Sequence, residues 1–380
     1  MTSMSSFRTA VDRIAIGRIL LGWIACGILL LAGPALQPPL PSAALWLVLA
    51  GIVVVIVVCA FGVVVQAEHL ARRLGDPYGT VILTLSIVVI EVILICAVML
   101  GPGEHATIAR DSVMAASMIV LTLVTGAALL IGGLRGQDLR VNPTGSSTYL
   151  SLLVVLVAVA FALPGVLGTG GSYTAAQEVP VIVLTVVLYG FFLVRQAGAQ
   201  SGDFQEVGED PASSSEDRTP IGEILRLHRP EIVTRTVLLL STVSPIVVLS
   251  HDMASLLDAG LDRLGAPVAL SGLLIGLIVF LPEGITTLRA AAAGEGQRMS
   301  NLAHGALVSC VGLTLPAVLV IGRLTDQRVI LAETPTGLLL LGVSLLLSIV
   351  TFSARRPDAT HGAVHLVVFV LYVLSILAPA

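Results

Sequence analysis

The chain has 380 residues, of which 56% are hydrophobic and only 12% are charged. An ordinary soluble domain has about 25% charged residues, so this composition indicates an integral membrane protein. The net charge is -4, and no basic stripe interleaved with aromatic residues occurs in the sequence. A nucleic-acid partner therefore has no support, and the lipid bilayer is the expected environment.

Apolar segments bounded by Gly, Pro, Arg or acidic residues predict eleven membrane-spanning helices, since about 20 apolar residues cross the hydrocarbon core. The predicted fold class is all-α and polytopic. The first span follows Arg8 and Arg13 without a convincing small-residue cleavage site, so we interpret it as an uncleaved helix. The predicted spans are residues 14–33, 43–66, 78–101, 111–134, 149–167, 179–197, 232–250, 268–291, 301–322, 335–353 and 362–378.

The distribution of basic residues predicts the orientation. All 20 basic residues are arginines. With a cytoplasmic N-terminus, only Arg110, Arg263, Arg323 and Arg328 face outward, and the rest fall in cytoplasmic loops. Basic residues concentrate on the cytoplasmic side of membrane proteins, so we expect a cytoplasmic N-terminus and a periplasmic or extracellular C-terminus.

Two segments repeat one pattern. "GTVILTLSIVVIEVI" contains Glu91 and "SGLLIGLIVFLPEGITTLRA" contains Glu283, and each is followed by a helix rich in small residues that opens at Asp111 or Asn301. The two glutamate helices are five spans apart and therefore cross the membrane in opposite directions. Inverted repeats of this kind are typical of secondary transporters, whose site lies at the midplane on interrupted helices. Pro282, directly before the second glutamate, predicts such an interruption.

The predicted organisation has four parts. Residues 1–42 form an extra N-terminal helix, 43–197 the first inverted repeat of five helices with its motif at 75–134, and 232–380 the second with its motif at 265–322. The acidic cytoplasmic linker, 198–231, is rich in Ser and acids, and such composition predicts a disordered, solvated segment. Gathering or sensing of cytosolic cations is the alternative interpretation of its charge.

Glu91 and Glu283 are the only carboxylates predicted deep in the membrane. A charge at that depth costs at least ~2.5 kcal/mol, and no basic residue lies deep in any predicted span. Each acid therefore needs a proton or a bound cation, unless it is hydrogen-bonded structurally to a neighbouring helix. Ca²⁺ prefers oxygen ligands and binds only after the protons have left, so competition between protons and a cation at this pair predicts antiport.

Hydroxyl groups on the same helices are candidate oxygen ligands. They belong to Thr80, Thr84, Ser86, Thr287 and Ser309, of which Thr84, Thr287 and Ser309 are the selected candidates. Serine and threonine are also common packing residues in membrane helices. Their role as ligands is therefore an expectation that depends on their position relative to the two acids.

Other titratable residues allow two interpretations each. His304 is a candidate proton relay or neighbour of the cation site, or a histidine hydrogen-bonded between helices. Glu68 and Asp111 lie at predicted entrances, where they attract cations or form ordinary ion pairs. His361 and His365 share a helix face, and such a pair is a weak indication of a metal site.

At these residues the sequence resembles the bacterial calcium/proton (sodium/proton) antiporters of the ChaA type, within the cation/calcium exchanger (CaCA) superfamily. The resemblance rests on "GDPYGTVILTLSIVVIEV", "GLIVFLPEG", "VGLTLP" and "HGAVHLVVFVLYVLSIL", and covers about Gln66 to Leu377. It implies an eleven-span exchanger of the bacterial inner membrane that expels Ca²⁺, with Na⁺ or K⁺ as alternative ions, in return for protons. No cofactor is expected, and Glu91 and Glu283 match the two essential acids.

Two positions depart from the family pattern. Ile90 stands where the superfamily usually has proline before the first acid, so the third span is expected to be less interrupted than the eighth. The asparagine that is common in the following helix is missing, and Val120 or Thr122 stands in its neighbourhood. Fewer strong ligands therefore surround Glu91, and water molecules would complete a Ca²⁺ site that takes about six to eight oxygens.

The leading hypothesis is Ca²⁺/H⁺ exchange, and the nearest alternative is Na⁺(K⁺)/H⁺ exchange at the same site. A passive channel with an acidic filter is a second class. A membrane-embedded metal-dependent enzyme is a remote one, because it would need clustered histidines and the 7 histidines are scattered. The expected partners are inorganic cations, protons and lipid, whereas the sequence leaves the oligomeric state open.

Overall fold

The computed structural model describes residues 13–33, 40–74, 106–207, 228–267, 269–354 and 356–378, together with the single residues 88, 92, 95, 99 and 226. The regular structure in these ranges is helical, apart from one isolated bridge between Thr169 and Ser172. Within them, 10 helical stretches are long and apolar enough to cross a membrane. The all-helical, multi-pass fold class is confirmed, while the eleventh span and the inverted repeats stay predictions.

The 10 stretches coincide with ten of the predicted spans, and the remaining prediction, 78–101, falls almost wholly outside the described residues. α15 (Pro335–Ser353) has the predicted bounds. α11 (Arg229–Leu264), in contrast, continues well past the predicted end at residue 250. It ends at Gly265, whose φ of 63° is the left-handed conformation that glycine tolerates at a helix C-terminus.

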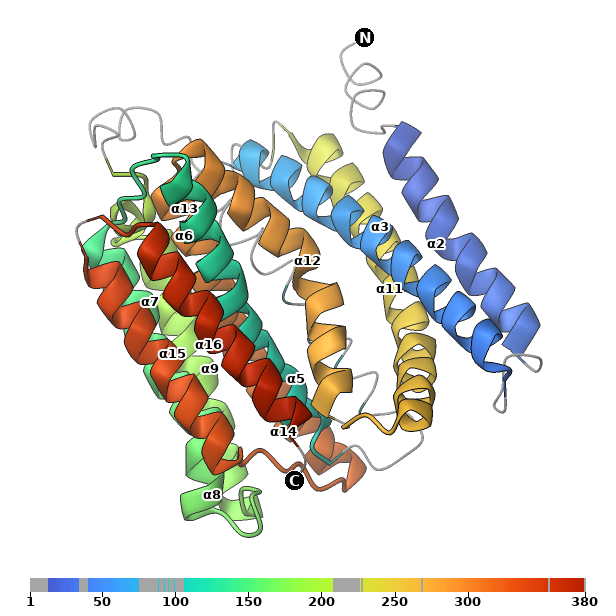
Figure 1. The fold of residues 1–380 in the computed structure, drawn as a ribbon. Helices are drawn as coiled ribbons and strands as arrows, with labels where there is room; N and C mark the ends of the chain where they lie inside the picture. The colour runs from blue at the N-terminus through green and yellow to red at the C-terminus, as the bar shows by residue number, and fades with distance from the viewer. Residues whose placement is uncertain are drawn as a thin grey trace. The chain divides into compact units, whose positions relative to one another are not determined.

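The first of two compact units comprises residues 1–98 and 212–271. Its long described helices are α2 (Arg13–Ala32), α3 (Ser42–Leu74) and α11, which run side by side (Figure 1). Gly22 permits the close approach of α2 to α11, because a Cβ there would lie 2.8 Å from the Pro245 side chain. Arg235 of α11 pairs with Glu231 at 3.0 Å and donates to Gln66 of α3, so the buried charge is neutralised.

The second unit comprises residues 99–211 and 272–380, and thus contains parts of both predicted repeats. Two continuous helical stretches, 108–134 and 296–325, form its core, since 78% of the apolar 18-residue segment of each is buried. They are the second helices of the two predicted motifs. The elements are α5 (Ile108–Met118), η2 (Ile119–Val124), α6 (Thr125–Leu134), α7 (Pro143–Val157), η3 (Ala158–Ala162), α8 (Leu163–Leu167), α9 (Ala175–Ala197), η4 (Ser201–Phe204), most of α12 (Ala269–Ala293), α13 (Gly296–Ser300), η5 (Asn301–Gly305), α14 (Ala306–Thr325), α15 and α16 (Ala359–Leu377).

Helix starts in this unit follow the local sequence. Asn142 caps α7 by accepting hydrogen bonds from two backbone N–H groups, and Pro143 occupies the first turn. Thr334 and Pro335 repeat this combination at α15. Side-chain caps satisfy amide groups that a helix leaves unpaired, and proline at the first position loses no hydrogen bond. α15 therefore begins at the predicted residue, whereas α7 begins six residues before its predicted start at 149.

Glycines bring α6 and α16 into direct backbone contact, as Figure 1 shows for the two neighbouring helices. A Cβ on Gly362 would lie 2.5 Å from the Leu130 backbone nitrogen, and one on Gly126 would lie 2.9 Å from the Gly362 carbonyl oxygen. A Cβ on Gly133 would lie 2.3 Å from the Ala359 nitrogen. Small residues allow this close packing in membrane helix pairs, so α16 is held tightly against the core.

α12 differs from the expectation of an interrupted helix. Residues 269–293 form one α-helix that contains Pro282 in its interior. A proline removes one backbone hydrogen bond and bends a helix without always ending it, and Figure 1 shows α12 changing direction along its length. The predicted interruption is therefore a bend within a continuous helix.

Candidate functional site

Glu283 lies in the interior of α12, directly after the bend-forming proline, and its residue is only 5% exposed. Three glycines of α12 allow this helix to pack against the α5–η2 stretch. A Cβ on Gly272, Gly276 or Gly284 would lie 3.4 Å from Asp111, 3.0 Å from Ile119 or 3.3 Å from Val124, respectively. These glycines thus place the backbone of α12 on both sides of Glu283 against the second helix of the first predicted motif.

The other half of the predicted site lies outside the described residues. Glu91 and Thr84 both belong to the third predicted span and lie outside the residues that the structure describes. The meeting of the two carboxyl groups therefore stays a prediction, and the described residues contribute one acid and its surroundings. Among the described residues, no group of three or more His, Cys, Asp or Glu side chains has metal-binding geometry.

Thr287 and Ser309, the two described hydroxyl candidates, are both buried. The Thr287 hydroxyl donates to the Glu283 carbonyl oxygen at 2.9 Å. Ser309 donates to the Gly305 carbonyl oxygen at 2.8 Å and accepts from the Tyr189 hydroxyl at 2.9 Å. A hydroxyl has one proton and two lone pairs, so Thr287 retains more accepting capacity toward a cation than Ser309.

Both core stretches contain a π-helical turn, η2 in the first and η5 in the second. Such turns are rare, widen the backbone and occur frequently at functional sites. In η2 the side chain of Thr122 donates to the Met118 carbonyl oxygen, and Thr125 donates to the Val120 carbonyl oxygen at 2.8 Å. η2 therefore presents rearranged carbonyl groups on the helix that α12 packs against.

His365 of α16 forms a hydrogen bond with one of these carbonyl groups. Its Nδ1 lies 2.7 Å from the Leu121 oxygen, and its Nε2 lies 3.1 Å from the Thr351 hydroxyl oxygen. The carbonyl can only accept, so Nδ1 carries the proton and Nε2 accepts from the hydroxyl. His361 instead contacts Asp358 at 2.7 Å, and the two histidines of α16 therefore do not act as a metal-binding pair.

His304 is fully buried in η5. Its Nδ1 lies 3.1 Å from the Ser300 hydroxyl, and its Nε2 has no hydrogen-bond partner among the described residues. Phe352 stands edge-on to the imidazole with ring centroids 4.6 Å apart, and Tyr149 lies 6.4 Å away. Nε2 is therefore available to a proton relay. If His304 served only for packing, this buried nitrogen would remain without a hydrogen bond among the described residues.

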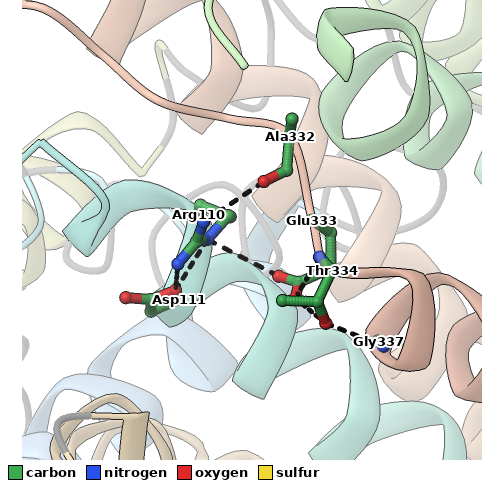
Figure 2. A network of polar contacts seen from close by, with 6 residues as sticks. All are labelled: Arg110, Asp111, Ala332, Glu333, Thr334 and Gly337. Carbon is green, nitrogen blue, oxygen red and sulfur yellow. Dashed lines mark hydrogen bonds and ion pairs between the residues drawn. The ribbon is translucent and has the colours of Figure 1, made fainter. Parts of the chain in front are cut away.

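Asp111, predicted at the outer entrance, forms an ion pair with Arg110 at 2.8 Å (Figure 2). The same guanidinium lies 3.7 Å from the Glu333 carboxylate and donates to the Ala332 carbonyl oxygen at 3.2 Å. Glu68, at the other predicted entrance, pairs with Arg72 at 3.3 Å. Both acids thus take part in ion pairs, which was one of the two interpretations left open by the sequence.

The first part of the acidic linker differs from the predicted solvated segment. Phe204 of η4 is buried in edge-on contact with Tyr149, whose ring centroid lies 5.0 Å away. The Glu206 carboxylate accepts hydrogen bonds from the backbone N–H groups of Gln297 and Arg298 at 3.2 and 2.7 Å. Phe204, the only aromatic residue of the linker, is the sequence signal for this docking.

Comparison with known proteins decides the family. The model of the family described as "Sodium/calcium exchanger protein" matches residues 44–198 and 234–378. The chain belongs to this family. It is also 32% identical over 319 residues, 84% of this chain and 86% of the relative, to the sodium-potassium/proton antiporter ChaA of Escherichia coli (strain K12).

Solved structures show the same fold. A structure of native YfkE has a TM-score of 0.69 at 16% identity and covers 95% of this chain and 99% of that chain. YfkE is described as a Ca²⁺/H⁺ antiporter. The H⁺/Ca²⁺ exchanger CAX has a TM-score of 0.64 at 12% identity, with 96% of this chain and 89% of that chain covered. This sodium/calcium exchanger family member therefore shares the fold of cation exchangers of the CaCA superfamily.

Proposed function

We propose that this protein is a proton-coupled cation antiporter that exports Ca²⁺. The observation that carries the proposal is the burial of Glu283 inside a membrane-spanning helix, 5% exposed. A carboxyl group in such a position is accommodated by a proton or by a cation. The same side chain therefore serves as a carrier of either ion, and its occupant changes between the two sides of the membrane.

Glu91 is the proposed second carrier. The repeated sequence pattern supports its pairing with Glu283, because the two acids occupy equivalent positions in the two motifs. Two carboxylates and nearby oxygens suit a hard divalent cation. Arrival of Ca²⁺ releases the protons, and arrival of protons releases Ca²⁺, so neither ion crosses without the other.

Thr287 is the described hydroxyl best placed to assist, since it lies one turn after Glu283 and retains free acceptor capacity. Ser309 and Thr84 are proposed as further oxygen ligands. His304 is proposed as a proton relay on the basis of its available Nε2. Neither Asp111 nor Glu68 is needed for the central exchange, because each already has an arginine partner.

Exchange of Na⁺ or K⁺ for protons at the same site is the second candidate. The specific observation in its favour is the relative from Escherichia coli, which is described as a sodium-potassium/proton antiporter. A monovalent cation would replace one proton rather than two, and the membrane potential acts on the difference at ~2.3 kcal/mol per elementary charge per 100 mV. The two candidates therefore differ in the charge that they move.

The proposed location is the bacterial plasma membrane, with the N-terminus in the cytoplasm and the C-terminus outside. The arginine distribution supports this orientation. Fusions of a reporter enzyme that is active only outside the cytoplasm provide the check. Activity is expected after the last helix, α16, and not before α2.

The test of function uses inside-out vesicles with an acidic interior, in which uptake of Ca²⁺, Na⁺ and K⁺ is measured together with proton efflux. We expect cation uptake coupled to alkalinisation, and its loss in Glu91→Gln and Glu283→Gln variants. Glu178→Gln serves as the matched control, because Glu178 forms a surface ion pair with Arg323. Normal exchange by the Glu283→Gln variant would overturn the proposal, and cation flux without proton movement would indicate a channel.

A further inference from the structure

A large groove between α7 and α15 lies apart from the candidate site. Its volume is about 730 Å³, and its lining follows one face of each helix. On α7 the face begins with the hydroxyls of Thr144, Ser147 and Ser151 and ends at Val154. On α15 it includes Ser353 near the helix end and Ile349 one turn deeper. The groove is therefore polar at one end and apolar at the other.

The length of the groove matches one leaflet of a bilayer. Thr144 and Val154 are ten residues apart on the helix, which corresponds to about 15 Å at 1.5 Å per residue. Half of the hydrocarbon core is also about 15 Å. The hydroxyl end adjoins the start of α7 and the end of α15, both at the membrane edge, so the polar residues lie at the level of lipid headgroups.

Charge at this edge is positive. The loops 135–142 and 354–358, which in the sequence precede α7 and follow α15, together contain four arginines and two aspartates. Both loops belong to the side that the arginine distribution assigns to the cytoplasm. Cytoplasmic leaflets carry anionic lipids, and basic residues near the surface attract them.

From this combination of shape, polarity and charge, we propose that the groove binds one anionic phospholipid of the cytoplasmic leaflet. One acyl chain lies along Val154 and Ile349, and the headgroup meets the hydroxyls and the flanking arginines. A chain of this length fills the apolar part, while a water-filled groove would leave Val154 and Ile349 hydrated at a cost. The proposal does not depend on the identity of the transported ion.

Phe352 connects the groove to the core of the second unit, because it contacts both. It is 3% exposed and forms the inner wall of the groove. Its ring also meets His304 with centroids 4.6 Å apart. A bound chain would therefore press against the aromatic ring that covers the imidazole, and lipid occupancy is coupled to the packing of η5.

The experiment uses the full chain in nanodiscs, with Trp23 and Trp46 replaced by phenylalanine and a single tryptophan introduced by Phe352→Trp. Phosphatidylglycerol and phosphatidylcholine with brominated acyl chains are the probes, each added as a minor fraction, because bromine quenches tryptophan on contact. We expect brominated phosphatidylglycerol to quench at about thirtyfold lower concentration than the choline lipid, which corresponds to attraction by two net positive charges, ~2 kcal/mol.

Two controls make the outcome decisive. Phe192→Trp, in the same background, places the probe in the aromatic cluster around Tyr149, away from the groove lining, and should not be quenched selectively. Adding Ser151→Phe fills the groove and should abolish quenching at position 352. Absence of quenching by either lipid, or quenching that the filled groove does not reduce, refutes the site. Equal quenching by both lipids refutes the anionic selectivity and hence the proposal.

Discussion

The Nδ1 atom of His365 on α16 lies 2.7 Å from the carbonyl oxygen of Leu121 in the π-helical turn η2. This hydrogen bond joins the last helix to the core stretch that faces α12. It is fully buried and continues through the Thr351 hydroxyl to α15. Three helices of the second unit therefore meet at one imidazole.

Replacing this histidine should lower stability. His365→Ala leaves a buried carbonyl and a buried hydroxyl without partners, and we expect a loss of about 1–3 kcal/mol in the free energy of unfolding. Cys26, Cys59 and Cys310 are buried, so a thiol-reactive dye reports thermal unfolding in a background in which the fourth cysteine, Cys96, is replaced by serine. Val367→Ala, on the exposed side of α16, is the control, and an equal effect of both variants would contradict the role of the hydrogen bond.

Arg110 should contribute to stability through its contacts with two carboxylates and one carbonyl oxygen. Its side chain is 19% exposed and that of Glu333 is 9% exposed, so Arg110→Gln leaves a largely buried carboxylate without its guanidinium. We expect a loss of about 1–3 kcal/mol. Arg110→Lys should restore only part of it, because a single ammonium cannot reproduce the fork that Arg110 presents in Figure 2. Full recovery by lysine in the same thermal assay would argue against this geometry.

The two buried hydroxyls of the candidate site should differ in their effect on transport. Thr287→Val removes an oxygen with free acceptor capacity, whereas Ser309→Ala removes one that already accepts from Tyr189. We therefore expect the larger increase in the cation concentration for half-maximal exchange with Thr287→Val, about tenfold or less for either variant. Tyr189→Phe frees a lone pair on Ser309, and an unchanged ranking of the variants in that background would count against the explanation.

Backbone contact between α6 and α16 predicts a strict requirement for glycine. Gly362→Ala places a methyl group 2.5 Å from the Leu130 nitrogen, and overpacking of this kind costs about 1–3 kcal/mol. Gly342→Ala, in the neighbouring helix α15, meets no atom within 4 Å and should be neutral or slightly stabilising. Thermal unfolding of the two variants side by side checks the prediction.

Asp358, just before α16, provides a pH-dependent cap. The hydrogen bond with the His361 side chain, and then the backbone N–H groups, hold the pKa of this carboxyl below its ordinary value. A depressed pKa means that the stabilisation is complete above the unfolded pKa of about 3.9 and is lost as pH falls toward the folded value. The melting temperatures of wild type and Asp358→Ala should therefore converge on acidification below about pH 4. A constant difference would exclude ionisation as its source.

Hydropathy was sufficient to predict ten spans because the bilayer demands a run of apolar residues at each crossing. The bounds of α15 followed from Thr334 and Pro335, which are local signals. The end of α11 was missed because polar residues at 250–252 suggested a loop, although the backbone continues helical to Leu264. Polarity alone does not end a helix whose hydrogen bonds remain internal.

The site was predictable in part. Burial of Glu283 followed from its apolar neighbours, but the turn η2 did not, because one extra residue in a helical turn leaves no trace in hydropathy. Arg110 and Glu333 form an ion pair although they are 223 positions apart in the sequence (333 − 110). Their contact depends on tertiary packing. The environment of Tyr173 also depends on tertiary packing. Its hydroxyl donates to the Val159 carbonyl oxygen at 2.6 Å, and burial raises the pKa of Tyr173 to about 12.

The carboxylate of Glu206 marks the point where the connection after α9 is attached to the core of the second unit. The helical stretch that it caps runs on to Ser309, so a force or chemical change applied to the connection is delivered at the start of a candidate ligand helix. Neutralising this one side chain by Glu206→Gln would weaken that attachment without changing any candidate ligand.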